Sequence, residues 1–257
     1  MTASPRTPPC TLVTIPISHY CEKARWALER AGVEYLERAH LQILHWVAVR
    51  RAGGGRTAPV LRCGDRVFAE SADIVAFADS RGADLSSGLA EVRALEDELD
   101  ARLGPHGRRW MYDHMRGETA LISHYGPTGV PAWQRAALPV AFPLVARVID
   151  RYLDITPESV AESLEEVWAV FDSVGERLGD GGGEGRFLVG DRFTAADLTF
   201  AALSAPLVLP PEYGVPLPLL DELPARMAAV VRELRSHPAG AHALAMYRTE
   251  RRAVPGE

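Results

Sequence analysis

The sequence has 257 residues, of which 47% are hydrophobic and 24% are charged, a composition typical of a soluble globular protein. Its formal net charge of −6 argues against general nucleic-acid binding, which requires a basic surface. No run approaches 18 apolar residues, so no membrane-spanning helix is expected. Residues 1–9 lack an apolar core and are predicted to be a disordered lead-in, not a secretory signal. We therefore expect a cytoplasmic protein that binds neither nucleic acid nor membranes.

The three cysteines are Cys10, Cys21 and Cys63. An odd and sparse set does not indicate a disulfide framework, and no CxxC pair is present to bind zinc. The cysteines therefore favour a reducing compartment and no metal site. We interpret Cys10 and Cys63 as structural. The richness in Ala, Arg, Gly and Val indicates a GC-rich bacterial genome.

The first third of the chain predicts a mixed α/β domain. Short β-branched and alternating runs indicate strands, and turn residues separate them from helical segments. One parallel crossover joined to a hairpin predicts a four-stranded mixed sheet with helices on its faces. The expected elements are a strand at 10–15, a helix at 18–30, a strand at 33–39, a loosely helical segment at 41–52, strands at 58–62 and 66–69, and a helix at 71–82.

The rest of the chain, after a linker at 83–90, is predicted to be all helical. Residues 157–178 carry the clearest pattern, with Pro157 in the first turn and apolar residues at helical spacing. The glycine-rich segment 180–185 and the proline-rich segment 206–218 are interpreted as surface excursions. The expected helices lie at 91–103, 110–126, 133–153, 157–178, 194–206 and 221–235, with prolines interrupting the second and third.

Four stretches resemble the glutathione transferase family. Residues 17–28 (ISHYCEKARWAL) are similar to its first loop and helix, and residues 57–61 (TAPVL) to the cis-proline loop of thioredoxin-like domains. Residues 70–74 (ESADI) resemble the Glu–Ser pair that holds the γ-glutamyl group, and residues 190–198 (GDRFTAADL) the buried capping box. Each motif alone is weak, but their common order and spacing are specific.

The resemblance spans residues 10–240 and implies two domains. We expect a thioredoxin-like glutathione-binding domain at 10–84 and an all-α helical bundle at 90–250. It further implies a serine-type enzyme like the bacterial theta and omega members, a homodimer, glutathione as co-substrate, and a small-molecule electrophile as second substrate. Thr194 and Asp197 also form a helix-capping box on residue spacing alone.

Ser18 is the candidate catalytic residue. Glutathione reacts as a thiolate, and a free thiol has a pKa of about 8.5, so the site must stabilise the ionised form. A helix N-terminus and a hydroxyl donor meet at Ser18, which we expect to donate a hydrogen bond to sulfur. The alternative is that Ser18 only caps the helix.

Cys21, three residues later, matches the resolving position of CxxC proteins and is expected to be buried and inert.

The resemblance also implies a set of glutathione contacts. A cis bond before Pro59 would present the backbone of Ala58 to the bound peptide, whereas the alternative is an ordinary trans proline. Ser71 would hold the γ-glutamyl carboxylate and Glu70 its ammonium group, or the pair simply caps a helix. Further candidates bordering the first loop, or reaching the glycine carboxylate, are His19, Tyr20, His45 and Arg51.

A second-substrate pocket is expected between the domains, against residues 105–130. Aromatic and methionine side chains suit an adaptable apolar pocket, although they suit a helical core equally well. The candidates are Trp110, Met111, Met115 and Tyr125, with Tyr112 and His124 beside them.

The expected reaction is addition or exchange of the glutathione thiolate on an electrophilic, largely apolar small molecule. Isomerisation, dehalogenation, ether cleavage and peroxide reduction need the same thiolate, and the sequence does not separate them. The alternatives are a non-catalytic scaffold of the same fold, a thiol-dependent oxidoreductase, or a site for a thiol other than glutathione.

Overall fold

The N-terminal part of the chain is built on a mixed four-stranded sheet, as predicted. The computed structural model describes residues 10–179 and 185–252, so the predictions for 1–9 and for most of 180–185 lie outside the described residues. The strand order is β2-β1-β3-β4, with β1 parallel to β2 and the other neighbours antiparallel. The strands are β1 (Cys10–Thr14), β2 (Tyr35–Ala39), β3 (Val60–Cys63) and β4 (Arg66–Phe68).

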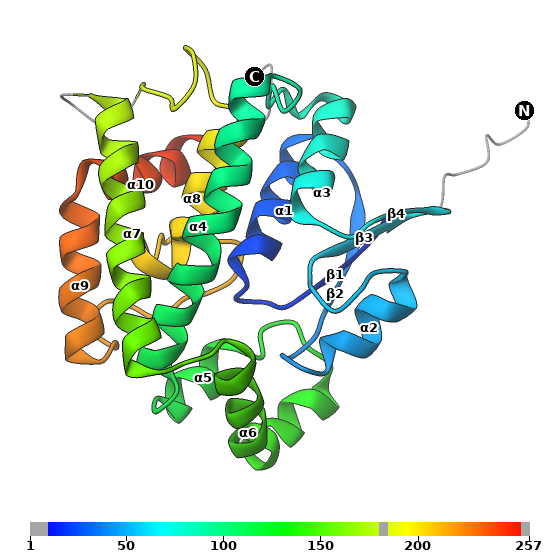
Figure 1. The fold of residues 1–257 in the computed structure, drawn as a ribbon. Helices are drawn as coiled ribbons and strands as arrows, with labels where there is room; N and C mark the ends of the chain where they lie inside the picture. The colour runs from blue at the N-terminus through cyan, green and yellow to red at the C-terminus, as the bar shows by residue number, and fades with distance from the viewer. Residues whose placement is uncertain (1–9, 180–184, 253–257) are drawn as a thin grey trace, which may run out of the picture.

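Helices cover both faces of this sheet (Figure 1). Leu12 belongs to the main core, whereas its neighbour Val13 packs with Val49 and Val60 on the other face, as alternation along a strand requires. Helices α1 and α3 lie between the sheet and the helical domain, and α2 covers the opposite face. Their bounds are α1 (His19–Arg30), α2 (His45–Ala52) and α3 (Ser71–Ala78), which a π-helical turn, η1 (Asp79–Ala83), continues.

The remainder of the described chain is helical. Its centre is α8, which is buried along its whole length and packs against α4, α1 and α10. In the described part of the chain, no helix combines the length and apolarity needed to cross a membrane. The helices are α4 (Ala90–Met115), α5 (Thr119–Tyr125), α6 (Ala132–Tyr152), α7 (Pro157–Leu178), α8 (Ala195–Val208), α9 (Ala225–Ser236) and α10 (Pro238–Glu250).

Several predicted helix boundaries are wrong, mostly at prolines. Helix α4 continues through Pro105, whereas the sequence predicts a break before residue 110 and a helix onward to 126. Pro139 and Pro143 lie inside α6 instead of interrupting it. A helical proline loses one hydrogen bond, and in α4 the burial of its apolar face against α7 and α8 outweighs that loss. The final helix α10, which begins after the cap residue His237, is not among the predicted elements.

Buried ion pairs join α1 to the helical domain on two sides. The Glu22 carboxylate is fully buried and accepts hydrogen bonds from Arg251 Nε at 2.7 Å and from the Gly214 backbone N–H at 3.1 Å. Lys23 places its Nζ 2.9 Å from Glu96 and 2.6 Å from the Asp100 carboxylate. Since a buried charge is stable only when paired, these contacts fix how α1 sits against α4 and the chain end.

Cys10 and Cys63 form a disulfide, which corrects the expectation of unpaired structural thiols. Thr11 pairs with Arg62 in the antiparallel β1–β3 register. Cys10, one residue before Thr11, therefore lies opposite Cys63, one residue after Arg62. The pairing depends on this register across 53 residues of sequence, which cysteine counting does not reveal.

The predicted capping box at the start of α8 is confirmed. The Thr194 backbone N–H donates to Asp197 Oδ2 at 3.0 Å, and the Leu188 N–H donates to Oδ1 at 2.8 Å. Asp197 is fully buried, and His242 Nε2 lies 3.3 Å from its Oδ1. One carboxylate thus satisfies the start of the central helix and the loop before it.

Replacing Asp197 with alanine should lower the free energy of unfolding by about 3 kcal/mol, because two buried backbone donors lose their acceptor. Urea unfolding of both proteins measures this difference. The control is Asp191→Ala, an exposed aspartate in the same loop, which should change stability by less than about 0.5 kcal/mol. Equal effects of the two changes would contradict the structural role of the box.

Candidate functional site

Two cavities meet where the sheet domain faces the helical domain. The first, which we call the serine cavity, is lined by Ser18, Ala58 and residues of α2, α4 and α6, and its space of about 780 Å³ includes open solvent. The second, the apolar cavity, lies among α4, α5, α6 and the segment after α8, and its space of about 1060 Å³ also includes open solvent. The lining residues common to both are Ile17, Gln42, Met111, Tyr112 and Ile149.

Ser18 stands at the N-terminus of α1 and opens onto the serine cavity. Its Oγ accepts a hydrogen bond from the Cys21 backbone N–H at 3.4 Å, so the capping alternative describes a contact that is present. A hydroxyl that accepts in this way keeps its own proton for another acceptor, and no such acceptor occurs among the described residues. Ser18 can therefore cap the helix and donate to a ligand at the same time.

Cys21 is buried with no exposed surface, which confirms that it faces inward. The Ile15 backbone N–H donates to its Sγ at 3.4 Å. Burial raises the pKa of the Cys21 thiol, which keeps it protonated and unreactive.

The Ala58–Pro59 peptide bond is cis, as the resemblance implies. Pro59 is buried, whereas Ala58 is half-buried and lines the serine cavity together with Thr57. The backbone of Ala58 and the Ser18 hydroxyl thus border the same space.

Glu70 and Ser71 lie at the start of α3, outside the lining of the serine cavity. Glu70 is the residue that precedes the helix, and its side chain makes no capping hydrogen bond. Burial and the carboxylates of Asp73 and Asp100 raise the pKa of Glu70. Ser71 is buried. The negative charge of Glu70 also contributes to raising the pKa of Tyr20, which lines the cavity.

His19 and His45 both line the serine cavity. Burial and the neighbouring Arg108 lower the pKa of His19 to about 3, and its Nε2 has no hydrogen-bond partner in the described chain. Burial lowers the pKa of His45 to about 4, and its Nε2 lies 3.1 Å from the Arg56 carbonyl oxygen. Both histidines are therefore neutral at pH 7.

Tyr20 lines the cavity as well, whereas Arg51 does not. The Tyr20 hydroxyl donates to the Asp100 carbonyl oxygen at 2.8 Å, which ties α1 to α4. Arg51 is exposed at the end of α2 and lines neither cavity, so the structure does not bring it to the site. Within residues 10–179 and 185–252, no three His, Cys, Asp or Glu side chains are grouped as metal ligands.

One face of α4 supplies two site residues that the sequence analysis missed, Gly104 and Arg108, beside the expected Tyr112. Gly104, Arg108 and Tyr112 are four residues apart and share one side of the helix. At Gly104 a Cβ atom would lie 2.0 Å from Tyr20 Oη, so only glycine allows α1 this close. Arg108 lines the serine cavity. The spacing is a detectable signal, but the predicted break near Pro105 conceals it.

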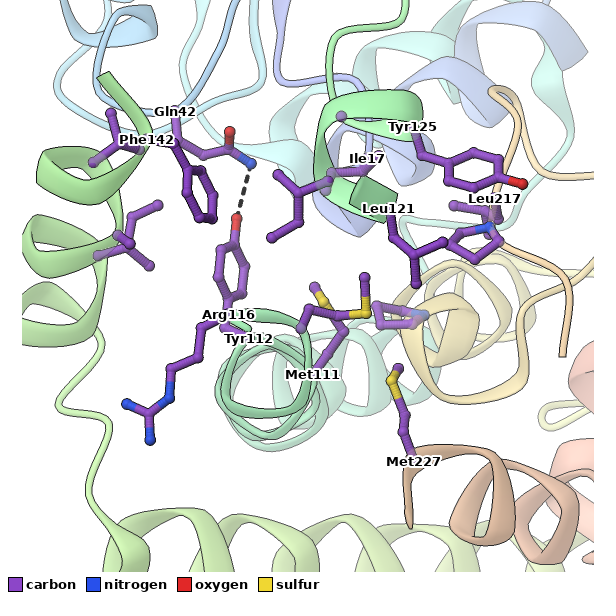
Figure 2. A pocket seen from close by; sticks show the side chains of 18 of the residues that line it. Ile17, Gln42, Met111, Tyr112, Arg116, Leu121, Tyr125, Phe142, Leu217 and Met227 are labelled. Carbon is purple, nitrogen blue, oxygen red and sulfur yellow. Dashed lines mark hydrogen bonds between the residues drawn. The ribbon is translucent and has the colours of Figure 1, made fainter. Parts of the chain in front are cut away.

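Gln42 and Tyr112 form the polar part of the wall between the two cavities. Gln42 Nε2 donates to the Tyr112 hydroxyl at 2.9 Å (Figure 2). Burial raises the pKa of Tyr112, so its phenol stays protonated. Tyr112 is one of the residues expected beside the second-substrate pocket. Gln42 is not among the sequence-based site candidates, because its contact with Tyr112 spans 70 residues and two domains.

The apolar cavity takes three of the four predicted pocket residues. Met111, Met115 and Tyr125 line it, and Figure 2 shows Met111 with Tyr112 and Leu121 around the same space. The prediction for Trp110 is wrong, because this residue is only 1% exposed and belongs to the helical core. Adjacent helical positions differ by about 100° in direction, which turns Trp110 away from the cavity that Met111 faces.

The proline-rich segment after α8 forms one wall of the apolar cavity. Leu209, Tyr213, Leu217 and Pro218 all contribute to the lining, so this segment is more than a surface excursion. The Gly214 N–H bond to Glu22 anchors it. Near the far end of the segment, the Tyr125 hydroxyl donates to Glu222 Oε2 at 2.7 Å.

Comparison with known families agrees with this geometry. The N-terminal domain of the glutathione S-transferase family matches residues 12–84, and its C-terminal domain matches residues 157–233. Together the two matches span more than half of the chain, in the order that the family requires. The chain belongs to the glutathione S-transferase family.

Solved glutathione S-transferases share the fold at low sequence identity. The enzyme of Ceriporiopsis subvermispora in complex with glutathione is 16% identical with a TM-score of 0.62, and the match covers 97% of this chain and 100% of that one. A glutathione transferase of Phanerochaete chrysosporium is 17% identical (TM-score 0.58, coverage 98% and 100%). One from Methylobacillus flagellatus with glutathione bound is 14% identical (TM-score 0.58, coverage 94% and 96%). None of the curated proteins matches the chain.

The burial of Cys21 generates a labelling prediction. In the native protein no cysteine should react with a thiol reagent, because Cys21 is buried and protonated and the other two are paired. After unfolding in guanidinium without reductant, one thiol per chain should react, as counted by mass spectrometry. Cys21→Ser should leave none. Rapid labelling of the native protein would contradict the burial, and three thiols after unfolding would contradict the disulfide.

Proposed function

We propose that this glutathione S-transferase is an enzyme of the serine type, similar to theta and omega members. Glutathione would bind in the serine cavity, and its thiolate would attack an electrophile held in the apolar cavity. The observation that carries the proposal is the shared wall. Ser18 borders one cavity, methionine and aliphatic side chains border the other, and Ile17 and Tyr112 border both.

Ser18 would act by stabilising the thiolate and would not itself attack the substrate. Its hydroxyl proton has no acceptor among the described residues, and the unpaired N–H groups of the first turn of α1 add a partial positive charge. A charge-assisted hydrogen bond contributes about 1.5 to 3 kcal/mol, which corresponds to about one to two pKa units. That shift brings the thiol pKa close to neutral pH.

The rest of the glutathione molecule would lie along Ala58 and α3. The backbone beside the cis bond is free to pair with an extended peptide. Glu70 and Ser71 would receive the γ-glutamyl ammonium and carboxylate groups. The described lining of the serine cavity contains Arg56 and Arg108 but no carboxylate, and this balance favours an anionic ligand. His45 also lines this cavity and is neutral.

The second substrate would be bulky and largely apolar. Met111, Met115, Leu121 and Phe142 make most of the apolar cavity's wall hydrophobic, and methionine adapts to ligands of different shape. Conjugation to such molecules is a detoxification reaction.

A disulfide-exchange function of Cys21 is disfavoured because its thiol is buried away from both cavities.

The assembly and location follow from the family. We propose a homodimer, because a two-fold pair is the commonest assembly of soluble proteins and the resemblance implies it. We also propose a cytoplasmic location. The Cys10–Cys63 disulfide removes the cysteine argument for a reducing compartment, so this location depends on the family resemblance.

Calorimetric titration with reduced glutathione tests the thiol site. The wild-type protein should bind with a Kd between micromolar and low millimolar. A Kd of 1 mM corresponds to a binding free energy of about 4.1 kcal/mol. Absence of binding up to about 10 mM would mean a weaker interaction than this and would reject glutathione as the ligand. Ser18→Ala should still bind but lose the thiolate absorbance at neutral pH, with turnover falling about 10- to 100-fold. Ser18→Thr, which keeps a hydroxyl, should retain most of both. Removing the Ser18 cap should also lower the free energy of unfolding of Ser18→Ala by about 1 kcal/mol, and an unfolding curve of each variant measures this loss of stability separately.

Filling the apolar cavity tests where the second substrate binds. Ala146→Trp places a large ring in the lining, so the KM for a bulky apolar electrophile should rise about tenfold while the KM for glutathione stays unchanged. The control is Ala136→Trp, an exposed position on the same helix, which should alter neither. A rise in the glutathione KM alone would contradict this assignment of the two cavities.

A further inference from the structure

Arg108 is a cation in the serine cavity that lacks an anion. It is half-buried and lines the cavity, and its buried Nε has no hydrogen-bond partner. None of the ion pairs and hydrogen bonds in the described chain involves its guanidinium. By contrast, its neighbour Arg109 donates to the Leu153 carbonyl oxygen at 2.7 Å and to Ser163 Oγ at 2.9 Å.

An unsatisfied guanidinium at this depth needs an explanation. The group carries five N–H donors and cannot lose its charge in a protein, and buried polar groups are almost always hydrogen-bonded. Leaving the buried Nε–H of Arg108 unpaired lowers stability. A cation held this way in a cavity therefore indicates that its partner comes with the ligand.

The packing of α4 places Arg108 beside the start of α1. One turn before it, Gly104 lets the Tyr20 ring touch the helix, and one turn after it, Tyr112 meets Gln42. The positive charge of Arg108 influences the pKa of His19, of Tyr20 and of Tyr112. Two of these three residues follow Ser18 directly in sequence.

The other charged or titratable groups around the cavity do not compete with Arg108. His19 and His45 are neutral at pH 7, with pKa values of about 3 and about 4. The only other cation in the described lining is Arg56, which is exposed and lies over the Trp46 ring at 5.8 Å. The remaining titratable groups are phenols, which are uncharged: Tyr20, Tyr112 and Tyr152.

We propose that Arg108 is a catalytic residue that stabilises the thiolate of bound glutathione, an inference that rests on the proposed function. When the thiol ionises, the S–H bond breaks, the electron pair remains on sulfur, and the proton passes to water at the cavity mouth. Arg108 stays charged throughout and supplies the opposite charge, while Ser18 supplies the hydrogen bond. The helical domain thus takes part in activating a ligand that the sheet domain binds.

The size of the effect follows from the charge. An opposite charge within about 4 to 6 Å lowers a pKa by about one to three units, and the serine hydroxyl acts in addition. Because Arg108 has no partner in the described protein, replacing it with a neutral side chain strands no buried carboxylate. Arg108→Gln should therefore fold as well as the wild type.

The experiment compares the thiol pKa of bound glutathione in wild type, Arg108→Gln, Arg108→Lys and Arg93→Gln, from the pH dependence of thiolate absorbance. The last variant removes the same charge from an exposed position of α4. Affinity for S-methylglutathione, which has no ionisable thiol, is measured alongside. We expect Arg108→Gln to raise the thiol pKa of bound glutathione by about one unit or more. Arg108→Lys, which keeps a positive charge, should raise it by less, and Arg93→Gln should leave it unchanged. All four proteins should bind S-methylglutathione with affinities within about threefold of one another.

Three results would overturn the proposal, and they are distinguishable. An unchanged thiol pKa in folded Arg108→Gln would remove the role of the charge. Weaker binding of S-methylglutathione with an unchanged thiol pKa would assign Arg108 to a glutathione carboxylate instead. Failure of the wild-type protein to bind either glutathione or S-methylglutathione would reject the proposed function, and the inference with it.

Discussion

The buried carboxylate of Glu22 is the contact on which the arrangement of the site depends. It lies in the first turn of α1, four residues after Ser18, and it binds Arg251 from the chain end and Gly214 from the proline-rich segment. Arg25 Nη1, also buried, lies 3.4 Å away. Removing one member of such a group leaves an uncompensated buried charge, a loss of about 3 to 5 kcal/mol. The orientation of α1, and hence of Ser18, is therefore set by residues more than 190 positions away.

This junction connects the two cavities mechanically. Glu22 belongs to α1, whose N-terminus carries Ser18 at the serine cavity. Gly214, which donates to Glu22, belongs to the segment whose residues Tyr213 and Leu217 form part of the wall of the apolar cavity. Lys23, on the other side of α1, holds α4 through Glu96 and Asp100. A protein that brings a thiol and an electrophile together must fix the distance between two binding sites, because reaction requires near-contact geometry. Buried, paired charges are suited to that task.

The features that sequence analysis predicted correctly are local ones. Ser18 before a helix, a proline after a small residue at a strand start, and the Thr194–Asp197 box each occupy a few consecutive positions, so their physical role follows from short-range geometry. The features it missed are set by packing. Arg108 reaches the site only because α4 continues past Pro105. Trp110 and Met111 differ only in the rotation of α4, and composition does not distinguish which of them faces a cavity.

The Cys10–Cys63 bond has a topological consequence for the site. It closes the backbone from β1 to β3 into a covalent ring, and both Ser18 and Ala58 lie on that ring. The ring also contains the exposed glycine-rich turn between α2 and β3, the type of segment that proteases cut first. A single cut there would open the ring without separating the two fragments, so the serine and the cis-proline backbone would remain on one covalently connected molecule.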